Sequence, residues 1–106
     1  MLGLMPSVYI PECSDGSYYV GSTRTLAHRV DAHMMGLGAA YTRSRLPVRL
    51  LWHEEFENIA EAFWWEKRIQ NWSRAKREAL MRGDYTALRR AAKKRFEPRA
   101  PVDEAE

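Results

Sequence analysis

The stretch that decides the fold is VYIPECSDGSYYVGSTRTLAHRVDAH, residues 8–33. β-Branched and aromatic residues on both sides of a Ser-Asp-Gly triplet at 14–16 predict two strands, 7–13 and 18–22, joined as a hairpin. The triplet fits a three-residue loop, a type I turn whose last residue is left-handed, a conformation that glycine adopts without a Cβ penalty. We therefore expect an antiparallel hairpin with Gly16 at the left-handed position.

The length of this loop fixes which side chains share a face of the hairpin. With three loop residues, Cys13 pairs with Ser17, and Tyr9 lies opposite Gly21. Tyr9 and Tyr19 then become diagonal neighbours on one face, with open space beside the glycine. A two-residue loop would place the tyrosines on opposite faces, because a one-residue shift of register turns every side chain over. We predict the three-residue register.

A helix is expected directly after the hairpin. One of the two threonines at 23 and 25 can cap it, and glycines follow its expected end near residue 35. Leu26, Arg29 and His33 recur at helical spacing. The face that carries the leucine is therefore expected to carry the arginine and the histidine as well.

The middle of the chain predicts a third strand and a longer helix. Residues 41–46 are expected to form a loop or short turn, and residues 48–56 a strand. Asn58, followed three residues later by Glu61, is a capping-box variant that opens the helix. Apolar residues then recur at intervals of three and four, at Ile59, Ala62, Phe63, Ile69 and Trp72.

Glu66 lies within that apolar stripe and is the most informative residue of the second half. An ionised carboxylate on a buried face is costly unless a partner compensates for it. A functional site would supply such a partner, and so would a structural ion pair with Arg29. The aromatic residues at 52, 63, 64, 65 and 72 are interpreted as core and interface residues, with base stacking by one or two of them as the alternative.

Two shorter helices are predicted in the C-terminal part. Ser73 can cap one that runs to Arg82 and ends at Gly83. Asp84 can cap a last helix over residues 85–96. The predicted order of elements is therefore β-β-α-β-α-α-α, an α+β fold in which helices flank a small three-stranded antiparallel sheet.

The composition is that of one small globular domain, with 106 residues, 45% of them hydrophobic and 29% charged. We place this domain at residues 1–97 and interpret residues 98–106, PRAPVDEAE, as a disordered acidic tail. The N-terminus does not resemble a signal peptide, and no apolar run approaches the length of a membrane span. We therefore expect a cytoplasmic protein.

The net charge of +3 is unevenly distributed along the chain. Residues 50–66 carry five glutamates and no lysine or arginine, whereas residues 67–99 carry 12 basic and 3 acidic residues. A polyanion such as nucleic acid suits the basic segment, and a pair of solvated surface helices suits it about as well. The candidate phosphate contacts are Arg43, Arg45, Arg74, Lys76 and Arg77.

The chain resembles the GIY-YIG nuclease family, in particular its small single-domain bacterial members. Residues 8–10, VYI, stand where the family has its first motif, and residues 19–21, YVG, where it has its second. Residues 23–33 resemble the segment that supplies the family's arginine and, four residues on, a histidine or tyrosine. Glu66 stands where the resemblance places a metal-binding glutamate, and the resemblance extends from about residue 9 to residue 77.

This resemblance implies a role for each of five residues. Glu66 would hold one divalent cation per site, Mg²⁺ or Mn²⁺, with water at most other positions. Arg29 would hold the scissile phosphate and offset charge in the transition state. Tyr19, helped by Tyr9, would position or deprotonate the attacking water, and His33 would assist. A tyrosine with an ordinary pKa near ~10 is a poor base at neutral pH, so nearby cations would have to lower that pKa.

The expected function is metal-dependent endonucleolytic hydrolysis of phosphodiester bonds, with DNA rather than RNA as the nucleic-acid partner. The alternative is a nucleic-acid-binding module that has the fold and little or no turnover. Retention of the complete set of five residues favours catalysis, whereas the basic segment fits both functions.

Overall fold

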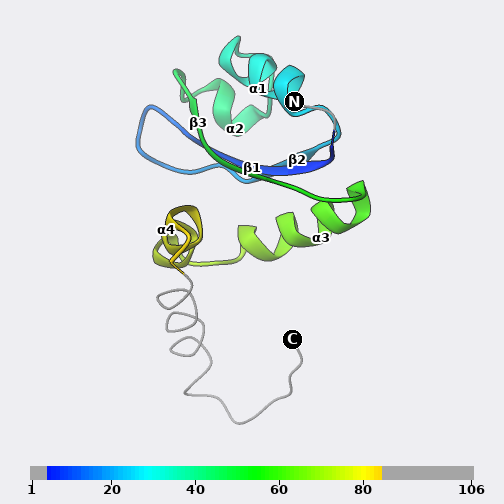
Figure 1. Ribbon diagram of the computed structural model, residues 1–106. Coiled ribbons are helices and arrows are strands. Elements are labelled where there is room, and N and C mark those ends of the chain that lie inside the picture. The colour runs from blue at the N-terminus through cyan, green and yellow to red at the C-terminus, as the bar shows by residue number, and fades with distance from the viewer. Residues whose placement is uncertain (1–4, 85–106) are drawn as a thin grey trace. The chain divides into compact units, whose positions relative to one another are not determined.

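The computed structural model describes residues 5–84, and the chain divides into two units, Met1–Asn71 and Trp72–Glu106 (Figure 1). In chain order, the described part of the first unit contains β1 (Ser7–Glu12), β2 (Gly21–Thr23), α1 (Leu26–Met34), α2 (Ala40–Arg43), β3 (Arg49–Glu55) and α3 (Ile59–Gln70). The strands form an antiparallel sheet in the order β2-β1-β3, with helices on both faces. The predicted α+β fold is confirmed.

The hairpin has the predicted register. The Cys13 amide donates to the Ser17 carbonyl at 2.8 Å, Gly16 has a φ of 85°, and Tyr9 pairs with Gly21. The regular part of β2 is shorter than predicted and is displaced toward the C-terminus. The reason is Pro11 in β1, which accepts a hydrogen bond from the Tyr19 amide at 3.1 Å but has no N–H to return one.

Helix α1 begins after Thr25 and is followed by Gly36 with a φ of 78°, close to the predicted bounds. Its capping differs in detail from the expectation, because the Thr23 hydroxyl accepts from the Thr25 amide while the Thr25 side chain makes no capping bond. Within the segment expected to be a loop or turn, residues 40–43 form the one-turn helix α2. Helix α3 starts as predicted, since the Asn58 side chain accepts from the Glu61 amide at 2.8 Å.

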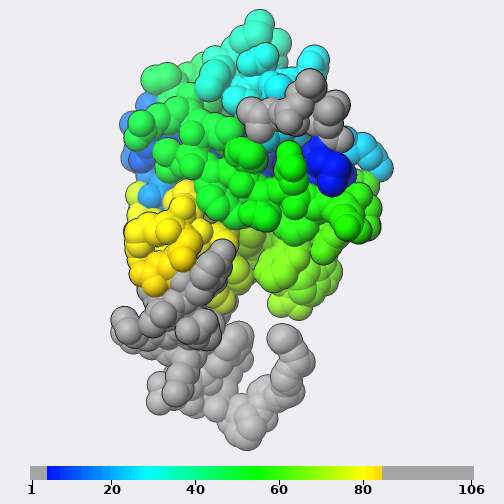
Figure 2. Space-filling model, viewed as in Figure 1, coloured from blue at the N-terminus to red at the C-terminus, as the bar shows by residue number. Residues whose placement is uncertain are grey.

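The two faces of the sheet are covered by different helices, α1 and α2 on one face and α3 on the other (Figure 1). Tyr9 points toward α1, where its hydroxyl meets His33, so the alternating neighbours Val8 and Ile10 point toward α3. All three of these β1 side chains are at most 1% exposed. In the space-filling view, green residues that include β3 lie in front of β1 (Figure 2). The central strand is therefore the core of the first unit.

The apolar stripe expected on α3 is narrower in the structure than in the sequence. Ala62, Glu66 and Ile69 are buried, but Phe63 is 52% exposed and Trp64 is 50% exposed. These two aromatic residues are therefore not core residues, and their expected role at an interface stays a prediction. Only a one-residue-wide stripe of the helix faces the sheet, so its flanking positions remain at the surface.

The second unit is described only as far as Asp84. Its helix α4 (Arg74–Arg82) has the predicted caps, a Ser73 side chain that accepts from the Lys76 amide and Gly83 with a φ of 72°. The predicted helix at 85–96 and the predicted tail at 98–106 lie outside the described residues. The assignment of residues 1–97 to one domain stays a prediction. Within residues 5–84, no helix has the length and apolarity that crossing a membrane requires.

Candidate functional site

A groove of about 460 Å³ follows the β2 edge of the sheet. One wall, the hairpin wall, is formed by Tyr9, Tyr19 and Arg29, and the other, the α3 wall, by Ile59, Phe63 and Glu66. The β2 residues and those just after it form the floor and rim, and they are Gly21, Ser22, Thr23, Arg24 and Thr25. The groove therefore brings together four of the five predicted site residues, and His33 lies behind Tyr9.

Tyr9 and Tyr19 lie on one face of the hairpin, as the register requires, with ring centroids 6.4 Å apart. Gly21 leaves room for both, because a Cβ at this position would lie 2.7 Å from the Tyr9 hydroxyl and 3.0 Å from the Tyr19 ring. Burial raises the pKa of Tyr9 to about 12 and also raises the pKa of Tyr19. Both tyrosines are therefore neutral phenols at neutral pH.

Behind Tyr9, a buried chain of hydrogen bonds runs from β1 to α2. The Tyr9 hydroxyl lies 2.7 Å from His33 Nε2, and His33 Nδ1 lies 2.8 Å from the Thr42 hydroxyl. Thr42 donates its own proton to the Ala39 carbonyl at 3.0 Å. Its oxygen must therefore accept from His33 Nδ1, since a hydroxyl has a single proton to donate.

This assignment fixes the donor and the acceptor of every hydrogen bond in the series. Burial and the nearby Arg29 charge lower the pKa of His33, so the imidazole is neutral at pH 7 and carries one proton, on Nδ1. Nε2 is then an acceptor, and Tyr9 donates its hydroxyl proton to it. Gly38 packs against the imidazole so closely that any Cβ there would overlap it. The position of His33 is thus set by hydrogen bonds on both sides and by van der Waals contact.

Arg29 reaches the groove from α1. Its Nε donates to the Tyr9 hydroxyl oxygen at 3.4 Å, a long hydrogen bond that raises the pKa of Arg29 further. The Tyr9 hydroxyl therefore accepts a hydrogen bond from Arg29 and donates one to His33. Both of these bonds are to other side chains of the fold, so the hydroxyl has a structural role. Tyr19 is half-buried, and within residues 5–84 its hydroxyl has no hydrogen-bond partner. Of the two tyrosines, Tyr19 is the one that is open to the groove.

Glu66 is held in place by neutral donors. Its two carboxylate oxygens accept from the Ser22 hydroxyl at 2.5 Å and from Gln70 Nε2 at 2.7 Å. Gln70 also donates to the Val20 carbonyl at 3.1 Å, which ties α3 to the strand edge. Among residues 5–84, the cation that forms an ion pair with Glu66 is Lys67, with Nζ at 3.9 Å. Among the described residues Arg29 forms no ion pair with Glu66, so the alternative of a structural Arg29–Glu66 bridge is not realised.

The donor set is compatible with a divalent cation that keeps most of its water. Glu66 is 8% exposed, lines the groove and has no arginine partner among residues 5–84. Those residues contain no group of three or more His, Cys, Asp or Glu side chains that could enclose a metal. Mg²⁺ is commonly bound by one or two carboxylates with water at its other positions, so a single carboxylate in an open groove fits it.

Of the five candidate phosphate contacts, the two in the first unit, Arg43 and Arg45, do not line the groove. Arg45 forms an ion pair with Asp15 at 3.1 Å and lies over the Tyr41 ring, and Arg43 is exposed at the end of α2. The other three belong to the second unit, where Arg74 pairs with Glu78 and the Lys76 amine lies 4.1 Å from the Trp72 ring centroid. Their role in binding stays a prediction.

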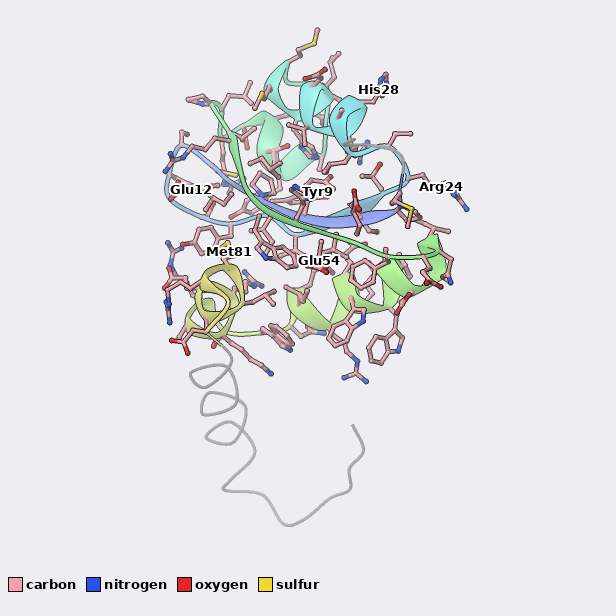
Figure 3. All side chains as sticks on the ribbon, viewed as in Figure 1. Tyr9, Glu12, Arg24, His28, Glu54 and Met81 are labelled. Carbon is pink, nitrogen blue, oxygen red and sulfur yellow. The ribbon has the colours of Figure 1, made fainter. Side chains whose placement is uncertain are left out.

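Sequence reasoning missed the residues that hold the site in shape, Ser22, Gln70, Thr42 and Gly38. Gln70 had a usable signal, because it follows Glu66 by one helical turn. Thr42 had none, because it contacts His33 only through the short helix α2. Arg24 also reaches the rim, where its side chain extends outward (Figure 3).

Comparison with known proteins links this geometry to a family. A family model described as the GIY-YIG catalytic domain matches residues 5–79. A UPF0213 protein of Halobacterium salinarum is 50% identical over 76 residues, which are 72% of this chain and 99% of that protein. A UPF0213 protein of Halalkalibacterium halodurans is 45% identical over 74 residues, 70% of this chain and 79% of the relative. A solution NMR structure is known for a UPF0213 protein from Bacillus halodurans that is 44% identical in sequence to this chain. The match covers 71% of this chain and 80% of that protein's chain, with a TM-score of 0.47.

Proposed function

Because this chain belongs to the GIY-YIG family, we propose that it is a divalent-metal-dependent endonuclease that hydrolyses phosphodiester bonds in DNA. The observation that carries the proposal is the groove, which brings a hydroxyl, a guanidinium and a carboxylate to one edge of the sheet. Phosphodiester hydrolysis needs charge neutralisation and an aligned water, and these groups can supply both.

In this proposal Glu66 holds one Mg²⁺ or Mn²⁺, which when bound supplies Lewis acidity and offsets phosphate charge. The carboxylate keeps its orientation because Ser22 and Gln70 donate to it. Both donors are neutral, so they do not offset the negative charge of the carboxylate, which the half-exposed Lys67 ammonium approaches at 3.9 Å. Removal of either donor would loosen the carboxylate without changing the charge of the site.

Arg29 binds the scissile phosphate. Its Nε is occupied by the Tyr9 hydroxyl, which leaves the terminal nitrogens of the guanidinium to face the groove. Tyr9 is in turn held by His33. In this arrangement Tyr9 and His33 are positioning residues that fix the direction from which the arginine meets the phosphate.

Tyr19 orients the attacking water through its hydroxyl oxygen. Burial raises the pKa of Tyr19 above its ordinary value, the Arg29 charge opposes this rise and the Glu66 charge adds to it. At neutral pH the phenol is therefore protonated, and its oxygen positions the water by a hydrogen bond. The His33 ring, 5.4 Å from the Tyr19 ring, contributes to the packing that holds the phenol. Tyr9 cannot take this role as readily, because it is 1% exposed.

The test is a cleavage assay with the purified full chain. Single-stranded, duplex and branched DNA, and RNA of the same sequence, are incubated with Mg²⁺, with Mn²⁺ and with EDTA. We expect metal-dependent cleavage of DNA that falls by at least about a hundredfold in Glu66→Gln and in Arg29→Ala. Glu61→Gln is the matched control, because Glu61 is an exposed acid on the same helix and lies outside the groove.

Binding measurements separate the two candidate functions. Calorimetric titration with Mn²⁺ should show binding to the native chain that is lost in Glu66→Gln. Cleavage that persists unchanged in both variants would refute the assignment of the site. Salt-sensitive DNA binding without metal-dependent cleavage of any substrate would instead identify a nucleic-acid-binding module.

A further inference from the structure

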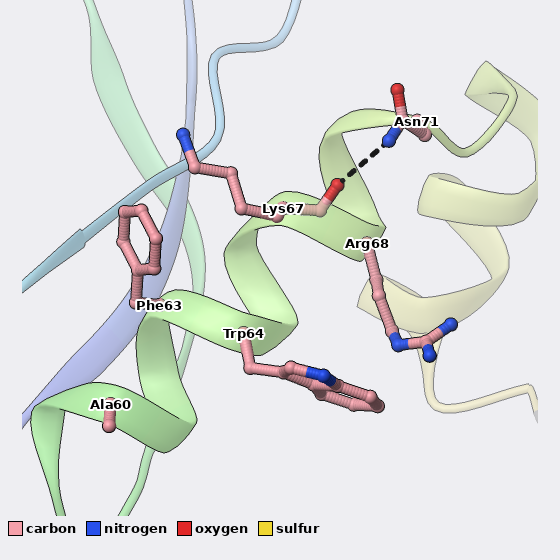
Figure 4. A pocket seen from close by; sticks show the side chains of 6 residues that line it. All are labelled: Ala60, Phe63, Trp64, Lys67, Arg68 and Asn71. Carbon is pink, nitrogen blue, oxygen red and sulfur yellow. Dashed lines mark hydrogen bonds between the residues drawn. The ribbon is translucent and has the colours of Figure 1, made fainter. Parts of the chain in front are cut away.

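The outward surface of α3 carries a second depression, of about 360 Å³, beside the groove (Figure 4). Phe63, Trp64, Lys67 and Arg68 form most of its lining, and we call these four residues the α3 platform. The two remaining lining residues, Ala60 and Asn71, lie at its ends. None of the roles proposed above for the catalytic groove explains why two large aromatic rings are exposed on this helix.

The exposure of the rings is substantial. Phe63 is 52% and Trp64 is 50% exposed, on a helix whose other face is buried against the sheet. An indole and a phenyl ring that are half in water lose much of the stabilisation that burial of such large apolar side chains provides. Adjacent exposed rings of this kind are typical of binding surfaces rather than of surfaces that serve only solubility.

Each ring is paired with a cation one helical turn away. The Lys67 ammonium lies 4.7 Å from the Phe63 ring centroid, and the Arg68 guanidinium carbon lies 3.9 Å from the Trp64 ring centroid. These distances are those of cation–π contacts, in which a cation covers one side of a ring. On the platform, the two aromatic rings lie on one turn of α3 and the two cations lie on the next turn (Figure 4).

The platform is continuous with the groove. Phe63 lines both depressions and therefore belongs to the α3 wall and to the platform. Glu66, the proposed metal ligand, precedes Lys67 directly in the chain, and its carboxylate lies 3.9 Å from the lysine ammonium. A nucleic-acid strand whose phosphate lies in the groove would therefore lead its next nucleotides across Phe63 and Trp64.

We propose that the α3 platform binds unpaired nucleotides adjacent to the scissile phosphate, and that the substrate therefore carries a single-stranded stretch. The aromatic rings stack on bases, while Lys67 and Arg68 neutralise the phosphates between them. The inference rests on the proposed nuclease function and deepens it by naming the substrate class.

The chemistry of the platform favours a single strand over a duplex. In a duplex the base faces are already stacked on one another, so an exposed ring finds no partner there, whereas every unpaired base offers a π face. The charge of the platform favours nucleic acid over a protein partner. Lys67 and Arg68 both line the depression, and two adjacent cations complement a phosphate backbone. A protein partner is the competing outcome of the test below.

Fluorescence anisotropy of the full chain tests the proposal, with a labelled single strand and the blunt duplex of the same sequence, in EDTA so that no cleavage occurs. Trp64→Ala is the diagnostic variant, because Trp64 lines the platform but not the groove. We expect its dissociation constant for the single strand to rise by on the order of tenfold and that for the duplex to change by less than about twofold. Trp64→Phe, which retains an aromatic face, should restore most of the single-strand affinity.

Leu37→Ala is the matched control, since Leu37 is 70% exposed and lies far from both depressions in the chain. It should leave both affinities unchanged, and circular dichroism should show native helix content in every variant. Lys67→Gln and Arg68→Gln should weaken single-strand and duplex binding together and reduce the salt dependence of both.

The proposed role of the platform would be overturned if Trp64→Ala lost single-strand and duplex binding equally, or if it lost neither. Self-association or binding of another protein that depends on Trp64, with unchanged affinity for nucleic acid, would also overturn it. The proposed nuclease function has a separate test, because it would be refuted if no metal-dependent, Glu66-dependent cleavage were found. Trp64-dependent binding without cleavage would support the platform and refute only the hydrolysis.

Discussion

On the hairpin wall of the groove, Tyr9, His33 and Thr42 form a buried chain of hydrogen bonds, whereas on the α3 wall Glu66 shares its helix with two half-exposed rings. The layer behind the first wall is closed, because each polar side-chain atom from Tyr9 to Thr42 already has a partner within the fold, whereas Tyr19 and Arg29 line the groove itself. The second wall is open, because its Phe63 ring is half-exposed and its Glu66 carboxylate lines the groove. The difference indicates that the buried network fixes the geometry with which Tyr9 and Arg29 meet the substrate, while the α3 wall provides the carboxylate proposed to hold the metal.

The largest effect is expected from Tyr19→Phe. This change removes the hydroxyl proposed to orient the attacking water, so we expect cleavage to fall by roughly 10²- to 10⁴-fold. The unfolding free energy should change by less than about 1 kcal/mol, since the hydroxyl has no hydrogen-bond partner within residues 5–84. Single-turnover kinetics and urea unfolding provide the two readouts.

Tyr9→Phe is the natural comparison for this variant. It leaves His33 Nε2 buried without its donor, so it should cost about 1–3 kcal/mol of unfolding free energy and also slow cleavage through Arg29. A Tyr9→Phe protein that is as stable as the native chain would contradict the closed description of the hairpin wall.

The next effect is steric and concerns the floor of the groove. Gly21→Ala would place a Cβ within 3.0 Å of both tyrosine rings, so we expect about 1–3 kcal/mol of destabilisation together with reduced cleavage. Ala27→Ser, which adds one atom at an exposed position of α1, should change the unfolding free energy by no more than about 0.5 kcal/mol. Thermal unfolding of the two variants side by side measures the difference, and equal melting temperatures would refute the close fit.

Acidification is expected to act on the hairpin wall through His33. Because burial lowers its pKa in the folded chain, the unfolded chain takes up a proton first as the pH falls below about 6.5. The contribution of His33 to stability is therefore present above that pH and is lost as the pH falls through the lower folded-state pKa. The slope should reach up to about 1.4 kcal/mol per pH unit.

Urea unfolding between pH 7.5 and pH 5 measures this slope. His33→Gln should flatten the pH dependence, whereas His28→Gln, at an exposed position of the same helix (Figure 3), should preserve it. An unchanged slope in His33→Gln would show that other groups are responsible.

The smallest effect is expected at the ion pair between Glu66 of the α3 wall and Lys67 of the α3 platform. Lys67→Gln removes an ammonium that lies 3.9 Å from Glu66 and is 52% exposed, so the unfolding free energy should fall by less than about 1 kcal/mol. A larger loss, measured by urea unfolding at low salt, would show that this wall is as tightly coupled as the hairpin wall.

The sequence was sufficient to predict the part of the site that depends on local rules. The three-residue loop determined the hairpin register, and the register determined that Tyr9 and Tyr19 share a face. The Asn58 cap and the spacing of the apolar residues placed Glu66 on the buried side of α3. In these cases one turn or one helical period carries the information.

The remainder depended on contacts between distant segments. Thr42 reaches His33 only because a four-residue helix, too short for a periodic pattern, returns to the sheet. The exposure of Phe63 and Trp64 could not be predicted either, because apolar residues at intervals of three and four do not reveal how wide a stripe of α3 the sheet covers.

One irregularity of the sheet has a consequence for insertions and deletions. Ile10 pairs with Trp52 but Pro11 pairs with Leu50, so Leu51 is an extra residue in β3. A bulge of this kind resets the alternation of a strand, and Leu50 and Trp52 therefore belong to opposite faces although they are two residues apart. Deletion of Leu51 would therefore join the two halves of β3 into one unbroken ladder, in which every residue keeps its β1 partner and its face. The length of β3 can consequently differ by this one residue among chains that keep the same core.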